Sequence, residues 1–128
     1  IMQPEQAMLI PAGSALVLQV HYVTTGKPES DRIGVGIRFA EGPIKKRVRY
    51  KIVEDDTFAI APGAPMHKTF ATRTIEEDAT LLGLFSHMHL RGRDMTFVAK
   101  YPDGEKETLL TLPNYNFDWQ LSYLYPPE

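Results

Sequence analysis

The run Phe85-Ser86-His87-Met88-His89-Leu90-Arg91-Gly92 places two histidines two residues apart, inside an apolar stretch that ends at a charged turn. On an extended strand, side chains at positions i and i+2 leave the same face, with Cα atoms about 6.5–7 Å apart. Two imidazoles at that spacing can hold one metal ion. On a helix, the same side chains would point about 200° apart around the axis and could not do so. The chemistry of this pair therefore depends on whether the run is a strand.

Alternation of apolar and polar residues around this run predicts strands rather than helices. The expected strands are residues 14–24, 33–39, 44–53, 80–90, 95–101, 105–112 and 115–125. The last of these is either one long strand or one strand that continues through a bend. Residues 80–90 are apolar on both faces, which predicts a strand buried on both. The aromatic row between Tyr115 and Tyr125 is expected to pack in the core, although such a row can also stack on sugars. Gly34 and Gly36 are expected to allow close approach of another backbone.

No segment keeps a helical period, and clusters of proline and glycine separate the expected strands. We therefore predict an all-β fold, an antiparallel jelly-roll or Greek-key β-sandwich. The acidic cluster Glu54-Asp55-Asp56 is the expected junction between two parts of the chain.

Composition excludes several classes of function. The chain of 128 residues has a net charge of −2, so no strong overall field attracts nucleic acid. No apolar run approaches the length of about 20 residues that crosses a bilayer. Without cysteine, disulfides, thiolate metal ligands and cysteine nucleophiles are excluded. Because the chain opens on Ile1, we expect it to be a processed or cut-down piece.

The basic residues 45–51 have two interpretations, a nucleic-acid groove or the solvated face of an edge strand. We favour the edge strand, because aromatic residues are not interleaved as single-strand binding requires. His67, beside a turn, is expected at the surface. His21 lies on an apolar strand and, taken alone, is typical of a packed histidine. His87 and His89 can be satisfied either by hydrogen bonds or by a metal.

Several motifs together resemble one family. They are Leu16-Val17-Leu18-Gln19-Val20-His21-Tyr22, Ile33-Gly34-Val35-Gly36-Ile37, Ile60-Ala61-Pro62-Gly63 and His87-Met88-His89-Leu90-Arg91-Gly92. In this order and rough spacing they resemble the copper type II, ascorbate-dependent monooxygenases, the group of peptidylglycine α-hydroxylating monooxygenase and dopamine β-monooxygenase. The run Asn114-Tyr115-Asn116-Phe117-Asp118-Trp119-Gln120 resembles the bacterial members. The likeness covers most of the chain.

The resemblance implies two jelly-roll domains, each with one copper. Residues 1–55 would end the first domain and residues 56–128 would begin the second. His21 would be one ligand of the electron-supplying copper, and His87 and His89 two ligands of the oxygen-binding copper. Ascorbate would reduce both coppers, and a C–H bond of a small molecule or peptide would be hydroxylated with O2. The family works outside the cytoplasm, so a periplasmic or secreted location is expected.

The chain also departs from the family pattern. The family supplies two further histidines to the first copper from upstream sequence, and a methionine to the second from sequence beyond Glu128. Met88 should face away from the histidine pair, and Met95 lies past the turn. Both sites are thus incomplete, and we expect the chain alone to be inactive. The completing ligands would come from the rest of the parent protein, and zinc could substitute for copper. A non-catalytic β-sandwich that binds a peptide, a glycan or a passive metal is the alternative.

Overall fold

The computed structural model describes residues 2–126, which form six short strands and no helix. The strands make three two-stranded sheets, as the prediction of an all-β chain requires. Within these residues there is no helix long and apolar enough to cross a membrane. The chain divides into two compact units, Ile1–Arg73 and Thr74–Glu128. The expected boundary after residue 55, between the end of one jelly-roll domain and the first part of the next, stays a prediction.

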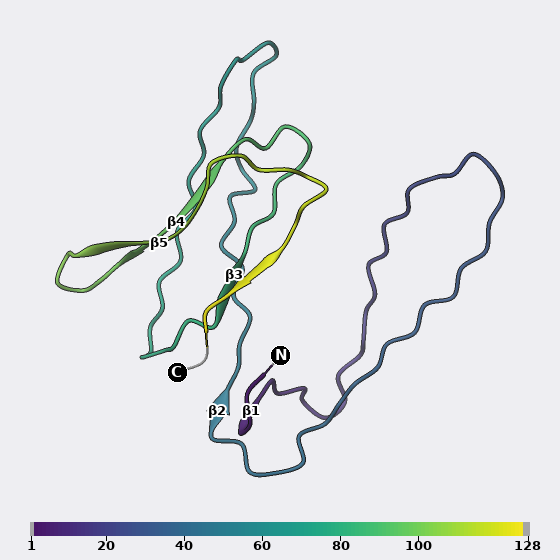
Figure 1. Cartoon of the computed structure of the whole chain (residues 1–128), viewed down its shortest axis with the longest axis vertical. Coiled ribbons are helices and arrows are strands. Elements are labelled where there is room, and N and C mark those ends of the chain that lie inside the picture. The colour runs from purple at the N-terminus through teal and green to yellow at the C-terminus, as the bar shows by residue number, and fades with distance from the viewer. Residues whose placement is uncertain (1, 127–128) are drawn as a thin grey trace. The chain divides into compact units, whose positions relative to one another are not determined.

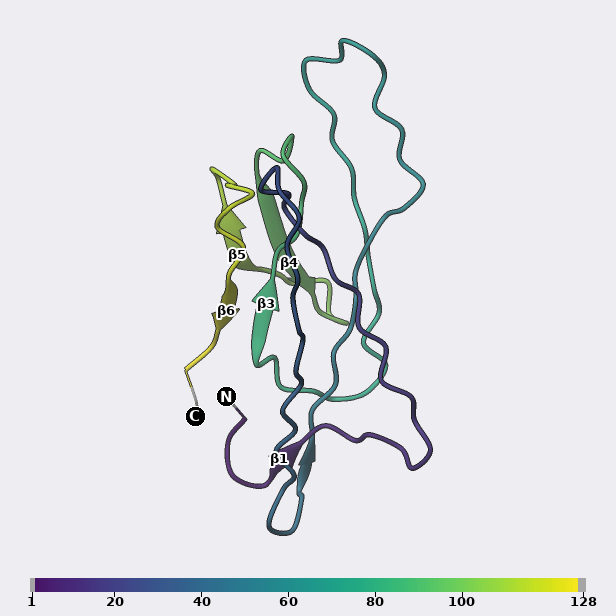
Figure 2. The same cartoon turned by 90° about the vertical axis from the view of Figure 1, so that its right-hand side faces the viewer.

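The first unit is held by a short parallel pair between β1 (Gln6–Ala7) and β2 (Lys46–Arg47). The Val48 amide extends this ladder by donating to the carbonyl of Ala7 at 2.8 Å. Next to the pair, the ammonium of Lys45 lies 2.7 Å from the carboxylate of Glu5. Between β1 and β2 the chain runs out to a distant turn and back (Figure 1). A second excursion follows β2 (Figure 2).

The strands predicted at residues 14–24 and 33–39 are wrong, because neither stretch pairs with another backbone in a ladder. Only Lys46–Arg47 of the predicted strand 44–53 is a strand. An added Cβ on Gly34 or Gly36 would meet no atom within 4 Å, so the expected close approach is also absent. The alternation of residues gives each of these stretches two distinct faces, but their large apolar side chains are not buried. Val17, for example, is 86% exposed.

Asp55 cross-links the second excursion of the first unit. Its Oδ1 accepts hydrogen bonds from the amide and hydroxyl of Thr57 at 3.0 and 2.8 Å, and its Oδ2 accepts one from the hydroxyl of Thr69 at 2.5 Å. These bonds, the one from Thr69 above all, hold the pKa of the Asp55 carboxyl below its usual range. Asp55, placed at the expected junction, therefore ties together residues of a single unit.

The second unit contains the longest ladder, an antiparallel hairpin of β4 (Met95–Lys100) and β5 (Lys106–Leu112). Its register shifts between Phe97 and Val98, which marks a bulge. Gly104 closes the turn with φ of 92°, and its amide donates to the carbonyl of Tyr101 at 2.9 Å. This confirms the hairpin that the turn Pro102-Asp103-Gly104 predicts.

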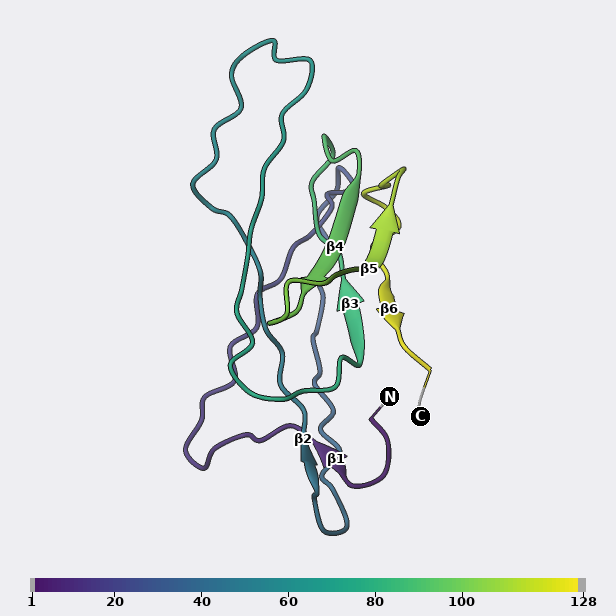
Figure 3. The same ribbon diagram turned by 90° about the vertical axis from the view of Figure 1, so that its left-hand side faces the viewer.

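The other sheet of this unit pairs β3 (Gly83–Phe85) with β6 (Ser122–Leu124), antiparallel (Figure 3). Both strands are far shorter than predicted. A turn interrupts residues 115–125, since the Trp119 amide donates to the carbonyl of Asn116 at 3.0 Å. The Asn116 side chain also accepts from the amide of Asp118 at 2.9 Å. Asparagine bonding to its own backbone ends the extended conformation that the aromatic alternation predicts.

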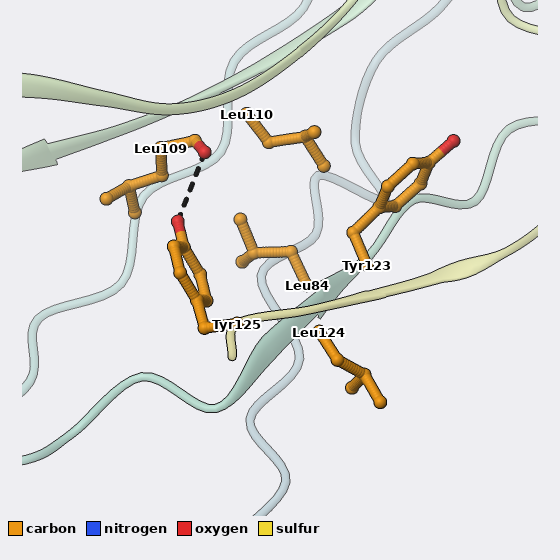
Figure 4. Close-up of a pocket in the computed structure, with 6 residues that line it drawn as sticks. All are labelled: Leu84, Leu109, Leu110, Tyr123, Leu124 and Tyr125. Atoms are coloured by element: carbon orange, nitrogen blue, oxygen red, sulfur yellow. Dashed lines mark hydrogen bonds between the residues drawn. The ribbon is translucent and has the colours of Figure 1, made fainter. Parts of the chain in front are cut away.

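Leucine and tyrosine side chains line a pocket of about 180 Å³ in the second unit (Figure 4). The lining residues are Leu84, Leu109, Leu110, Tyr123, Leu124 and Tyr125. The Tyr125 hydroxyl closes one side by donating to the carbonyl of Leu109 at 3.1 Å (Figure 4). The aromatic row does not form the expected core, because Trp119 is 65% exposed and only Tyr115, Tyr123 and the intervening Gln120 are half-buried.

Candidate metal site

Burial alternates along the histidine run at the period of an extended chain. Leu84 and Met88 are half-buried and Ser86 is buried, whereas Phe85, His87 and His89 are exposed. The two histidines therefore leave the same face, although β3 itself ends at Phe85. Burial on both faces was the wrong expectation, since only the Ser86 face is covered. The imidazoles stand on the side that is open to solvent.

The rings of His87 and His89 lie close together on that open side. Their centroids are 5.1 Å apart, and the ring planes are nearly perpendicular at 86°. The ring of Phe85 stacks on that of His87, with 6.5 Å between their centroids. The rings of His89 and Phe117 meet edge to face, with 6.3 Å between their centroids. Two phenyl rings thus flank the pair and leave its solvent side accessible.

Tyr115 fixes the backbone between the two histidines. Its hydroxyl donates to the Met88 carbonyl at 2.5 Å and accepts from the Met88 amide at 3.0 Å. The Tyr115 amide in turn donates to the carbonyl of Arg93 at 2.8 Å. Through these bonds a single tyrosine links the histidine run to the residues beyond its turn. We call the two bonds between Tyr115 and Met88 the tyrosine clamp.

Gly92 closes the turn after the pair. Its amide donates to the carbonyl of His89 at 2.8 Å. A Cβ at this position would lie 2.5 Å from Cβ of Met88 and 2.9 Å from Cδ1 of Tyr115. Such distances are too short for any side chain, so glycine is required where the turn folds back on the clamp.

The side chain of Gln120 contacts the imidazole of His87. Its Oε1 lies 2.5 Å from Nδ1 of His87, and its Nε2 donates to the carbonyl of Phe117 at 2.8 Å. Sequence reasoning placed Gln120 on the polar face of a long strand, with or without a bend, and missed this contact. The signal was Asn116 followed by Asp118, two turn-forming residues that bend the chain and redirect Gln120.

His21, assigned by the resemblance to a separate copper, lies in the first unit and is exposed. His67 is exposed as predicted, and its ring faces that of Phe58 at 5.7 Å. Met88 points to the covered face and Met95 begins β4.

Among residues 2–126, no group of three or more His, Cys, Asp or Glu side chains could hold a metal ion. The pair His87 and His89 therefore supplies two nitrogen donors. Imidazole nitrogen suits copper and zinc alike, so the donors fit either metal as part of a coordination sphere.

A scan against models of protein families found no match, and searches of curated proteins and of solved structures found none either.

Proposed function

We propose that His87 and His89 are two ligands of one copper site in an ascorbate-dependent, monooxygenase-like oxidoreductase. In the same proposal the chain belongs to a jelly-roll architecture, with residues 1–55 and 56–128 in successive domains, and works outside the cytoplasm. One observation supports the proposed metal site above all: the two imidazoles share a solvent-exposed face, with their ring centroids 5.1 Å apart. Copper is preferred over other metals because the histidine run occurs with the other motifs of the copper monooxygenases, in their order.

Each residue has a distinct role in the proposed site. The two imidazoles bind the ion, and the tyrosine clamp keeps the backbone between them from rotating one ring away. His21 is proposed as a ligand of a second, separate copper. When bound, copper supplies the redox chemistry that hydroxylates a C–H bond with O2, and ascorbate supplies the electrons. The open side of the pair leaves room for the remaining ligand and for a small-molecule or peptide substrate.

The experiment is anaerobic Cu(I) titration of the full chain against a chromophoric chelator. We expect His87→Ala and His89→Ala each to abolish tight binding, because one imidazole alone is a weak ligand. His67→Ala is the matched control, since it removes an exposed histidine that also lies beside a phenylalanine. X-ray absorption of the copper-loaded chain should show nitrogen ligands. Full copper stoichiometry in both variants of the pair would contradict the site.

Turnover provides a second readout. We expect residues 1–128 alone to show no hydroxylation coupled to ascorbate-dependent oxygen consumption, because each proposed copper has too few ligands in this chain. Coupled product formation by the isolated chain would show this expectation to be wrong.

A specific observation favours one alternative, a non-catalytic module that binds a peptide or glycan. Trp119 is 65% exposed and Phe117 36%, and exposed aromatic rings can stack on a sugar or a peptide side chain. Zinc binding without Cu(I) binding, together with a Trp119 fluorescence change on adding an oligosaccharide or peptide, would favour this alternative.

A further inference from the structure

We propose that Gln120 holds His87 in the tautomer with its proton on Nδ1, which makes Nε2 the metal-binding nitrogen of His87. The tautomer follows from contacts within this chain. Its consequence for the metal rests on the copper site proposed above. Gln120 is therefore a positioning residue, which acts on the metal through His87.

The orientation of the Gln120 amide is set by its second partner. The carbonyl of Phe117 can only accept a hydrogen bond, so the group 2.8 Å from it must be the amide nitrogen. The amide oxygen of Gln120 is then the atom that faces His87. The turn 116–119 places both partners, because it brings the Phe117 carbonyl and the Gln120 side chain to the same side.

The orientation of Gln120 determines the protonation of the ring. An amide oxygen has no hydrogen to donate, so the Nδ1 of His87 must be the donor in their 2.5 Å contact. A neutral imidazole carries one proton, and its other nitrogen keeps the lone pair. That nitrogen is Nε2. Hydrogen bonding of the non-ligating nitrogen is the usual way in which proteins fix a metal-binding histidine.

The two histidines differ in this respect, which provides an internal control. Among residues 2–126 the ring of His89 has no hydrogen-bond partner, and the rings of His87 and Phe117 are those it contacts. Changes at Gln120 should therefore alter the tautomer of His87 and leave that of His89 as it was.

The first test reads the tautomer directly in the metal-free chain. Long-range ¹H–¹⁵N NMR, about two pH units above the ordinary histidine pKa of about 6.5, distinguishes the two ring nitrogens. We expect His87 to be in the Nδ1–H form. Gln120→Leu should move it toward the tautomer mixture of a free histidine. Gln120→Glu keeps an acceptor beside Nδ1 and should retain the Nδ1–H form. An unchanged His87 tautomer in Gln120→Leu would overturn the proposal.

The second test measures Cu(I) affinity by chelator competition. Loss of such a supporting hydrogen bond weakens metal binding by about 10–100-fold, which is the expected effect of Gln120→Leu. Gln120→Glu should recover most of the affinity. Gln3→Leu is the matched control, because it makes the same substitution at an exposed position of the first unit and should change nothing.

The two tests separate this inference from the proposed function. If the wild-type chain binds no copper, the copper site fails, and the NMR result still decides whether Gln120 fixes His87. If copper binds through the pair but Gln120→Leu changes neither tautomer nor affinity, the copper site stands and the role of Gln120 is overturned.

Discussion

The two units of this chain start from similar sequence patterns and reach different structures. Residues 14–24 and 33–39 in the first unit alternate as regularly as residues 95–101 and 105–112 in the second. Only the second pair forms a ladder. Its connection is a tight turn with two backbone bonds between Tyr101 and residues 104 and 105. In the loop of the first unit the interactions come from side chains: the Tyr22 hydroxyl donates to the Asp31 carboxylate at 3.1 Å, and Lys27 pairs with Glu29 at 3.2 Å. Alternation thus defines faces, and the turn decides whether strands pair.

The largest expected difference between the two units is in the effect of histidine substitutions on copper binding. If His21 belongs to a different copper, His21→Ala leaves the tight Cu(I) equivalent of the pair intact, whereas His87→Ala removes it. Stoichiometry from anaerobic titration of both variants measures this. Loss of that equivalent in His21→Ala would contradict the assignment of His21 to a separate copper.

Glycine substitution should distinguish a paired from an unpaired stretch. In β3, a Cβ on Gly83 would lie 2.7 Å from the carbonyl oxygen of Tyr123, so Gly83→Ala must push β6 away. We expect a cost of about 1–3 kcal/mol, measured as faster amide exchange in β3 and β6. Gly34→Ala is the matched control, since Gly34 is in open space and the change should stay within about 0.5 kcal/mol. Equal effects at both positions would contradict the contrast between the units.

The turn itself can be tested at Gly104, where φ is 92°. A side chain in this conformation costs about 1–2 kcal/mol, so Gly104→Ala should speed amide exchange in β4 and β5. Gly26 has φ of 83° but lies in the loop of the first unit. Gly26→Ala should therefore leave exchange in β4 and β5 unchanged. Protection of the hairpin that survives Gly104→Ala would show that the ladder does not depend on its turn.

The smallest effect is a pH dependence of opposite sign in the two units. In the first, Thr69 and Thr57 lower the pKa of Asp55. The stabilisation is present above the ordinary aspartate pKa of about 3.9 and is lost as the pH falls through the lowered value. In the second, a hydrogen bond to Glu107 raises the pKa of Tyr101. That stabilisation is present below the ordinary tyrosine pKa of about 10 and is lost as the pH rises through the raised value.

NMR can follow both cross-links, through the Thr57 amide and through the ring protons of Tyr101. Asp55→Asn should abolish the acid transition, and Glu107→Gln should bring the phenol pKa of Tyr101 back toward its ordinary value. Titration of Asp55 at its ordinary pKa would contradict the cross-link.

Local signals in the sequence predicted the all-β class, the hairpin and the shared face of His87 and His89. Each depends on neighbouring residues alone: a proline-aspartate-glycine turn, or the period of an extended chain. The sequence did not predict that only one face of the histidine run is covered. It also missed Gln120, because the aromatic alternation of residues 115–125 concealed the turn at Asn116. Which backbone a strand pairs with depends on distant residues, and periodicity carries no information about them.

The tyrosine clamp has a consequence for protein engineering. Both of its hydrogen bonds go to the main chain of Met88 and neither involves an imidazole, so they do not depend on which side chains stand at positions 87 and 89. Residues 87 and 89 can then be exchanged as a cassette, for example for carboxylates that favour harder cations, without altering the scaffold that holds them apart. With the clamp in place, substitutions at residues 87 and 89 alone are expected to change the metal preference of this run.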